Sequence, residues 1–408
     1  MIDATIAFSE TDKFWDALVI GAGPAGATIA RLLSLSSRTV LLVDKADFPR
    51  DKVCGCCIND IAAGVLSKIG LEDLLSEQGA IPFSQLIVCE NEIKARLQLP
   101  TGFALSRSKL DAALIRAAIA SGVSFLPRVS ARVQSANESA RLVRIQNTND
   151  TNEVQAKLVI VADGLDGMSL SELPEFSTVA KENSKFGAGV VLPYADTFYE
   201  EGRIYMACSD HGYVGLVRIE DNKLDIAVAL NRDFSRQSGS PALASAAILE
   251  SAHFPVPAGF LTEHWAGTKT LTRSRLAISG ERLFLIGDAC GYTEPFTGEG
   301  MSWALLASTH MAPLADTAIE QWKPELAPLW RRQYLQLIGK KQKVSAVVAA
   351  CLKRGSLRRF CLKALSAVPE IARPVVDSIA ARKMQADLKI PDGSKIFMHL
   401  RNENVVKN

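Results

Sequence analysis

The chain has 408 residues, 48% of them hydrophobic, and a formal net charge of +2 at pH 7. This length predicts two or three domains with a substantial buried core. The balanced charge gives no reason to expect nucleic acid as a partner. The first residues lack the basic stretch and apolar core of a secretory signal, and no apolar run approaches the roughly 18 residues of a membrane span. Eight cysteines do not make a disulfide-dense scaffold in a chain of this length, so we expect a reducing cytoplasm.

The stretch Leu18–Ala30, LVIGAGPAGATIA, is a short apolar run followed by a G-x-G-x-x-G turn and a helix of small residues. Gly21 permits the tight turn, Gly23 lets backbone amides approach a pyrophosphate, and Gly26 lets the helix pack on its strand. A second strand, TVLLVDK, ends in Asp44, which is placed to accept a hydrogen bond from a ribose hydroxyl. This order predicts a dinucleotide site formed by Gly21, Gly23, Pro24, Ala25, Gly26, Asp44 and Lys45.

Two later segments indicate which dinucleotide binds. KLVIVADG, residues 157–164, is a buried strand ending in Asp163 and Gly164, and residues 282–300 read RLFLIGDACGYTEPFTGEG. The second segment resembles the GDA-x-G-x-x-x-P-x-x-G-E-G block of FAD-dependent oxidoreductases in the p-hydroxybenzoate hydroxylase superfamily, especially its geranylgeranyl reductase branch. The resemblance implies that Asp288 binds the flavin ribityl chain and that the loop from 295 to 301 lies beside the isoalloxazine. The residues expected to bind FAD here are Asp163, Gly164, Gly287, Asp288, Pro295, Gly298, Gly300 and Met301.

A helix starting near Gly300 would direct its positive end at the pyrimidine side of the flavin, where negative charge collects on reduction. Two more segments extend the resemblance. FPRDKVCG, residues 48–55, is similar to the loop of geranylgeranyl reductases that passes near flavin and substrate, and it implicates Arg50, Cys54 and Gly55. ALSRSKLDAAL is similar to the superfamily helix whose arginine contacts FAD, which implies that role for Arg107; we expect Asp111 to stabilise the helix.

The positions of these segments predict an α/β fold, with a Rossmann-like FAD-binding domain built from residues 1–80, 101–180 and 268–325. Residues 81–100 and 181–267 carry short alternating stretches such as GRIYMACS and KLDIAVAL, which indicate an antiparallel β-sheet domain for the substrate. Residues 326–408 would form a C-terminal helical extension. We expect a hydrophobic small-molecule substrate to bind between the two domains.

The extension is strongly basic: ten Lys and Arg residues and no acidic residue lie between Leu326 and Pro369. Amphipathic helices of this kind could rest on an anionic membrane surface and give access to a lipid-like substrate. The alternative is a solvated basic face on helices packed against the FAD domain.

The cluster Cys54-Gly55-Cys56-Cys57 supports two interpretations. Cys54 and Cys57 have the spacing of a redox pair that could exchange electrons with a flavin, which would fit a flavin-bound redox sensor. In the other interpretation Cys54 shapes the flavin site, and Cys56 and Cys57 pack. We expect no metal site, because no second C-x-x-C or H-x-x-x-H pattern is present.

The electron source is expected to be NAD(P)H docking transiently or a separate electron-donor protein, because no second dinucleotide fingerprint is present. Reduced flavin can then saturate a C=C bond of an isoprenoid-like chain, or activate oxygen as a monooxygenase of an aromatic or polyketide substrate. The small pair Cys290-Gly291 follows GDA where aromatic hydroxylases carry histidine, which favours reduction. Two departures weaken the match to long prenyl substrates and nicotinamide: YVGLVRI lacks the Trp and Pro of the reductases' Y-x-W-x-F-P strand, and ADGLDGMS carries extra residues. The catalytic candidates are Cys54, His211 and Tyr213.

Overall fold

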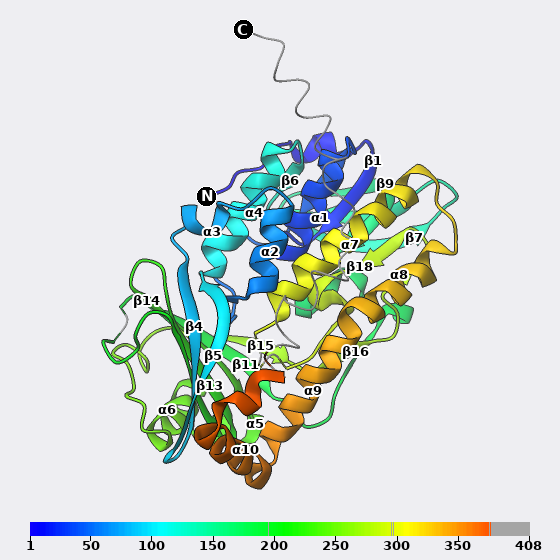
Figure 1. The fold of residues 1–408 in the computed structure, drawn as a ribbon. Coiled ribbons are helices and arrows are strands. Elements are labelled where there is room, and N and C mark those ends of the chain that lie inside the picture. Colours follow the sequence, from blue (N-terminus) through cyan, green and yellow to red (C-terminus); the bar gives the residue numbers. More distant parts are fainter. Residues whose placement is uncertain (195, 295, 297, 375, 377–408) are drawn as a thin grey trace.

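The computed structural model describes residues 1–194, 196–294, 296, 298–374 and 376. Two eight-stranded sheets organise this part of the chain, and the C-terminal helices run from the first sheet to the second (Figure 1). Within the same residues, every helix is too short or too polar to cross a lipid bilayer. The predicted α/β fold with a helical C-terminal segment is confirmed.

The first sheet has the order β17-β18-β9-β1-β2-β6, with the hairpin β7–β8 joined to β9. Its strands are β1 (Phe14–Ile20), β2 (Val40–Val43), β6 (Ser124–Leu126), β7 (Ser130–Ala136), β8 (Arg141–Gln146), β9 (Thr151–Val161), β17 (Ser279–Gly280) and β18 (Leu283–Leu285). From β18 to β6 the pairing is parallel, as the continuously apolar run of β2 predicts. The turns that follow β1, β2, β9 and β18 therefore meet at one edge, where ligands bind in such sheets.

Three helices, α1 (Pro24–Leu35), α4 (Arg107–Ala120) and α7 (Gly300–Glu320), form a layer in which α1 contacts both of the others. Small side chains in α1 let α7 approach closely, and the Ser308 hydroxyl donates a hydrogen bond to the Ala25 carbonyl at 2.9 Å. Two further helices, α2 (Asp60–Lys68) and α3 (Leu74–Glu77), connect this layer to the second sheet.

The second sheet has the order β15-β11-β14-β13-β12-β4-β5-β3. Its strands are β3 (Cys57–Ile58), β4 (Ile81–Glu90), β5 (Ile93–Ala104), β11 (Phe186–Leu192), β12 (Arg203–Ser209), β13 (Gly212–Ile219), β14 (Lys223–Leu230) and β15 (Ala266–Thr270). One face packs on α6 (Pro241–Ser251), which follows the short helix α5 (Arg232–Gln237). The sheet takes more of the chain than the predicted 81–100 and 181–267, because β3 joins it, β5 continues to Ala104 and β15 to Thr270.

A small sheet of β10 (Thr178–Ala180), β16 (Arg273–Arg275) and β19 (Gly291–Tyr292) also forms. The C-terminal segment comprises α8 (Leu326–Tyr334), a π-helical turn (Leu335–Gly339), α9 (Lys340–Lys353) and α10 (Gly355–Ala367). The Trp330 indole N–H donates to the Leu285 carbonyl at 2.9 Å and attaches α8 to β18. In contrast, α10 packs on β4 and β5 of the second sheet.

Arg358 fixes α10 to the second sheet. Its guanidinium donates to both carboxylate oxygens of Glu90, at 2.8 and 2.6 Å, and to Asp210 at 2.7 Å. Arg358 and Glu90 are 2% and 3% exposed, so this is a buried ion pair. One of the ten predicted basic charges therefore points into the protein, where it holds α10 against the second sheet.

We predict that Arg358→Ala lowers the free energy of unfolding by about 3–5 kcal/mol, because it leaves the Glu90 carboxylate buried without its cation. Urea unfolding monitored by circular dichroism measures the change. Lys363→Ala removes an exposed charge from the same helix and should change it by less than about 0.5 kcal/mol. Equal midpoints for the two variants would contradict the proposed role of the pair.

Candidate functional site

The turn after β1 forms a cradle that requires glycine at two positions. Gly21 has φ +102°, and a Cβ there would overlap the Ala162 carbonyl, while a Cβ on Gly26 would overlap the Gly21 carbonyl. Gly23 is the N-cap of α1 and supplies no side chain to cap it. The backbone N–H groups at the start of α1 are thus available for an anion, and the cradle fits the pyrophosphate of a dinucleotide.

Asp44 lies at the end of β2 beside this cradle, where sequence analysis placed it. Its carboxylate accepts hydrogen bonds from the backbone N–H groups of Ala22, at 2.7 Å, and Ala46, at 2.9 Å. A carboxylate has lone pairs beyond these two, so the fixed side chain can still accept a ribose hydroxyl. The neighbouring turn is therefore held in the geometry that an adenosine ribose needs.

A cavity of about 1160 Å³ extends from the cradle to the second sheet. The predicted FAD residues that line it are Gly23, Pro24, Ala25, Cys54, Gly55, Arg107, Asp163, Gly164, Gly287, Asp288, Gly298, Gly300 and Met301. Gly21, Gly26, Asp44, Lys45 and Arg50 are absent from its lining, and Pro295 lies outside the described residues. The structure thus brings segments that are distant in sequence around one elongated space.

Arg107 lies at the start of α4 and is directed toward the cradle. Its guanidinium forms two hydrogen bonds with Asp111, both at 2.8 Å, and both side chains are buried. A Cβ on Gly23 would lie 3.7 Å from Nη2 of Arg107, so the guanidinium reaches the phosphate turn. Arg50 lies behind this pair, with Nη2 3.6 Å from Asp111. Asp111 orients the arginine that faces the cofactor site.

Lys52 also lies in the cavity, although sequence analysis did not select it. Burial, followed by repulsion from Arg107, lowers the pKa of its ammonium group. Burial raises the pKa of Asp288 at the opposite wall, while Lys52 and Arg107 act against that rise. Asp163 also has a raised pKa because it is buried, and its Oδ1 atom has no hydrogen-bond partner. These charged and unsatisfied groups fit the polar linker of FAD, and the lysine in PRDKVCG was the available signal.

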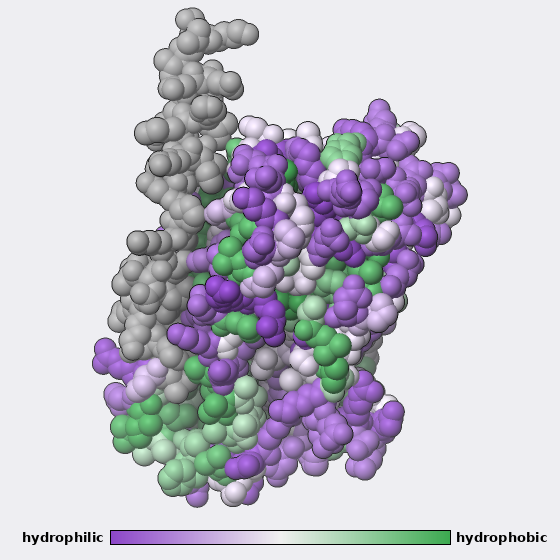
Figure 2. All heavy atoms as spheres, turned by 90° about the vertical axis from the view of Figure 1, so that its right-hand side faces the viewer, coloured by the Kyte–Doolittle hydropathy of each residue, from purple (hydrophilic) through white to green (hydrophobic). Residues whose placement is uncertain are grey.

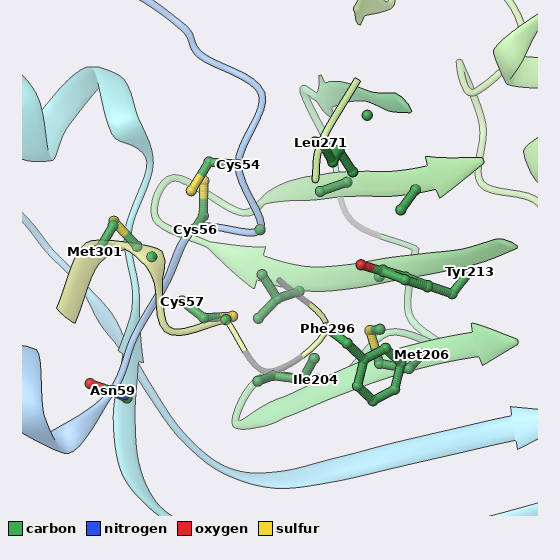
Figure 3. Close-up of a pocket in the computed structure, with 18 of the residues that line it drawn as sticks. Cys54, Cys56, Cys57, Asn59, Ile204, Met206, Tyr213, Leu271, Phe296 and Met301 are labelled. Carbon is green, nitrogen blue, oxygen red and sulfur yellow. The ribbon is translucent and has the colours of Figure 1, made fainter. Parts of the chain in front are cut away.

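The cysteine loop lies between the cradle and the second sheet. Figure 3 shows the sulfur atoms of Cys54 and Cys56 side by side, with Cys57 further along the loop. A hydrogen bond from Cys56 and the positive charge of Arg107, opposed by burial, together lower the pKa of Cys54 to about 6. The pKa values of Cys56 and Cys57 are raised well above the ordinary thiol value. Cys54 is therefore the cysteine of this loop that loses its proton most readily, and its neighbour is Cys56 instead of Cys57.

The far wall of the cavity is apolar. Tyr213 and Phe296 meet edge to face at 5.1 Å, and Figure 3 shows Met206, Ile204 and Leu271 around the same space. Burial keeps the pKa of Tyr213 well above its ordinary value, so its phenol is neutral at physiological pH.

Two polar features lie at this wall. Nζ of Lys185 is 2.8 Å from Oε1 of Glu294 in a buried ion pair. This pair joins the start of β11 to the loop between β19 and α7, the loop that was predicted to lie beside the flavin. Asp225 on β14 also lines the cavity, although sequence analysis did not select it. The available signal was the period-two pattern of KLDIAVAL, which places Asp225 on the same strand face as Ala227 and Ala229. His211, by contrast, is exposed and stacks on Phe234 at 4.0 Å, outside the cavity lining.

The C-terminal segment also contacts the loop between β19 and α7. The helix α7 begins at Gly300, as predicted, so its positive end points at this loop. The Ser345 hydroxyl of α9 donates to the Glu299 carboxylate at 2.7 Å, and Glu299 is buried. The fold and this cavity define a flavoprotein whose cofactor site and hydrophobic pocket share one space.

Residues 15–312 match the model of the FAD binding domain family, so the chain belongs to that family. It is 27% identical to a menaquinone reductase from Mycobacterium tuberculosis over 78% of this chain and 79% of the relative. It is 24% identical to the squalene monooxygenase of Rattus norvegicus over 71% of this chain and 52% of that longer relative. The fold is similar to that of a geranylgeranyl bacteriochlorophyll reductase-like protein from Thermoplasma acidophilum, with TM-score 0.74, 18% identity, and 95% and 99% of the two chains covered. The chain is an FAD-dependent oxidoreductase.

We predict that Gly26→Ala abolishes FAD binding, because the new methyl group pushes α1 away from the Gly21 turn. Absorbance at the flavin wavelengths and calorimetric titration with FAD measure the loss. Gly64→Ala is the matched control, because a Cβ there meets nothing within 4 Å and α2 gains about 0.5–1 kcal/mol from the change. A yellow Gly26→Ala protein with unchanged FAD affinity would contradict the close approach.

Proposed function

We propose that the protein is an FAD-dependent reductase that saturates C=C bonds in a long, isoprenoid-like hydrophobic molecule. The observation that carries the proposal is the continuity of the cavity, which joins the FAD residues to an apolar wall on the second sheet. The menaquinone reductase relative supports a prenylated or similarly apolar substrate. Reduction of an isoprenoid chain requires this combination, because the double bond has to lie beside the flavin while the chain extends away from it.

The cradle at α1, with Arg107 and Lys52, would hold the pyrophosphate, Asp44 the ribose, and Asp163 and Asp288 the ribityl linker. When bound, FAD supplies a hydride equivalent after two-electron reduction. We propose NAD(P)H or a separate reductase protein as the source of those electrons.

The second sheet positions the substrate and keeps water out. Gly215, Ala227 and Ala229 give its cavity face small side chains, which leave room for a chain between β12 and β14. Larger apolar side chains, among them Met206 and Phe296, close the space on either side. These small residues widen the cavity beside the strand YVGLVRI, which lacks the tryptophan that geranylgeranyl reductases carry in the corresponding strand.

Oxygen activation is the alternative, favoured by the relationship to squalene monooxygenase. The same apolar cavity would accept an olefin for either reaction. The two reactions differ in whether oxygen enters the product.

We expect anaerobically reduced enzyme to saturate a double bond in the unsaturated prenyl chain of menaquinone, so that the chain itself becomes two hydrogen atoms heavier. Flavin absorbance and mass spectrometry of the lipid follow the two halves of the reaction. Squalene with oxygen-18 gas is the comparison probe. Label in its product, with no reduced menaquinone chain under anaerobic conditions, would replace the reductase assignment by the monooxygenase one.

The mouth of the cavity suggests how a lipid enters. Val347, Phe360 and Ile371 line the cavity and are also 63%, 69% and 56% exposed. Figure 2 shows hydrophobic side chains gathered at the lower end of the molecule, where α10 lies in Figure 1. Exposed Lys353 and Lys363 lie on the same helices. We propose peripheral contact of this surface with anionic lipid, which a basic and apolar surface favours.

We predict that the protein floats with vesicles containing phosphatidylglycerol more than with phosphatidylcholine vesicles. The double variant Phe360→Ser, Ile371→Ser should lose most of this binding, because it removes apolar area from the mouth. Leu243→Ser, on the exposed side of α6 behind the second sheet, is the control and should bind as the original protein does. Equal failure to float with both lipids would remove the proposed membrane contact.

A further inference from the structure

The cavity face of the second sheet carries a carboxyl group on an otherwise apolar surface. On β14, Asp225, Ala227 and Ala229 line the cavity, while Leu224 and Ile226 belong to the core under α6. On β13, Tyr213 and Val217 line it in the same way. A strand places alternate side chains on one face, so Asp225 shares its face with residues that contact the substrate space.

Asp225 is buried and incompletely hydrogen-bonded. It is 4% exposed, and its Oδ2 atom has no hydrogen-bond partner. Its Cα pairs with Val191 of β11 and Val217 of β13, so the side chain projects from the middle of the sheet. A Cβ on the neighbouring Gly189 would lie 3.3 Å from Val53, so the cysteine loop passes directly over this part of the sheet. Asp225 therefore lies where the substrate wall meets the flavin site.

The groups around Asp225 favour its neutral form. Burial raises its pKa well above the ordinary carboxyl value, the negative charge of Cys54 raises it further, and Glu220 and Asp51 act in the same direction. A hydrogen bond from the Cys56 thiol opposes the rise, and Cys57 is a neutral neighbour. The cation Arg107 instead stabilises the charge on Cys54. These contacts favour a negative charge on the Cys54 thiolate and the protonated form of Asp225.

Saturation of an alkene adds a hydride equivalent to one carbon and a proton to its neighbour. We propose that the Asp225 carboxyl donates this proton, which makes Asp225 a catalytic residue of the proposed reductase. The inference rests on the proposed function, in which reduced flavin is the source of the hydride equivalent. The O–H bond of Asp225 breaks, and a C–H bond forms on the substrate; the resulting carboxylate lies within reach of the Cys56 thiol. It recovers its proton from water when the product leaves.

The experiment uses the FAD-loaded protein and the variants Asp225→Asn and Asp221→Asn. Asp221 undergoes the same chemical change in the β13–β14 turn, where it is exposed and outside the cavity lining. Infrared spectroscopy at neutral pH should show a protonated carboxyl band that Asp225→Asn removes and Asp221→Asn retains. This measurement requires no substrate. FAD affinity should be the same in all three proteins.

The kinetic measurement is the anaerobic rate at which the reduced enzyme saturates the prenyl chain of menaquinone, followed by mass spectrometry of the lipid after its quinone ring is reoxidised. We expect Asp225→Asn to be slower by about 100-fold or more, the usual contribution of a general acid. In the original protein the rate should fall as pH rises through the raised pKa of Asp225, because the donor loses its proton; in Asp225→Asn this fall should be absent.

An unimpaired Asp225→Asn rate, or an infrared band unaffected by the substitution, would overturn the assignment of the proton donor while leaving the reductase intact. If the original protein reduces neither menaquinone nor squalene but shows the protonated carboxyl band, the reductase assignment is overturned. The proposed role of Asp225 as proton donor is then overturned with it.

Discussion

The structure depends on the close approach of α1 to the end of β1. Gly21 and Gly26 lack the side chains that would separate helix from strand, so the first turn of α1 lies directly over the edge of the parallel sheet. The turns after β2, β9 and β18 end at the same edge, which brings Asp44, Asp163 and Asp288 near that helix end. If a methyl group at Gly21 or Gly26 displaced α1, the uncapped N–H groups of its first turn would move away from all three carboxylates at once.

Charge and apolar surface are separated along the cavity, and this separation decides what each half can bind. The half beside the first sheet contains Arg107, Lys52 and Asp288, whose charges suit a phosphate and sugar-alcohol linker. The half beside the second sheet is lined mainly by Met206, Tyr213 and alkyl side chains, with Asp225 among the few polar exceptions. An apolar chain loses little hydration energy there, whereas a polar substrate would leave its hydrogen-bonding groups unsatisfied.

The parts of the site that sequence alone predicted are those encoded in contiguous residues. The order of strand, Gly21, Gly23, Gly26 and Asp44 defines the cradle, because local backbone geometry determines it. Asp225 was missed, because its role depends on how β14 faces a loop more than 160 positions earlier in the chain. Sequence alone also did not indicate that β5 continues past residue 100 to Ala104, because this extension depends on pairing with β3 and β4. The inward orientation of the Arg358 side chain likewise depends on its ion pair with Glu90, which is distant in the sequence and cannot be recognised from a local pattern.

Cys54 illustrates why burial in this cavity does not neutralise every acid. Cys54 and Asp225 are both enclosed, yet a hydrogen bond from Cys56 and the positive charge of Arg107 stabilise the thiolate, while the carboxyl has the thiolate itself as a neighbour. Two adjacent negative charges in a medium of low polarity repel strongly, so the site holds one and protonates the other. The guanidinium of Arg107 is fixed by Asp111 and lies at the cofactor turn. The same arginine that lies at the glycine turn therefore favours the charge on Cys54 over a charge on Asp225.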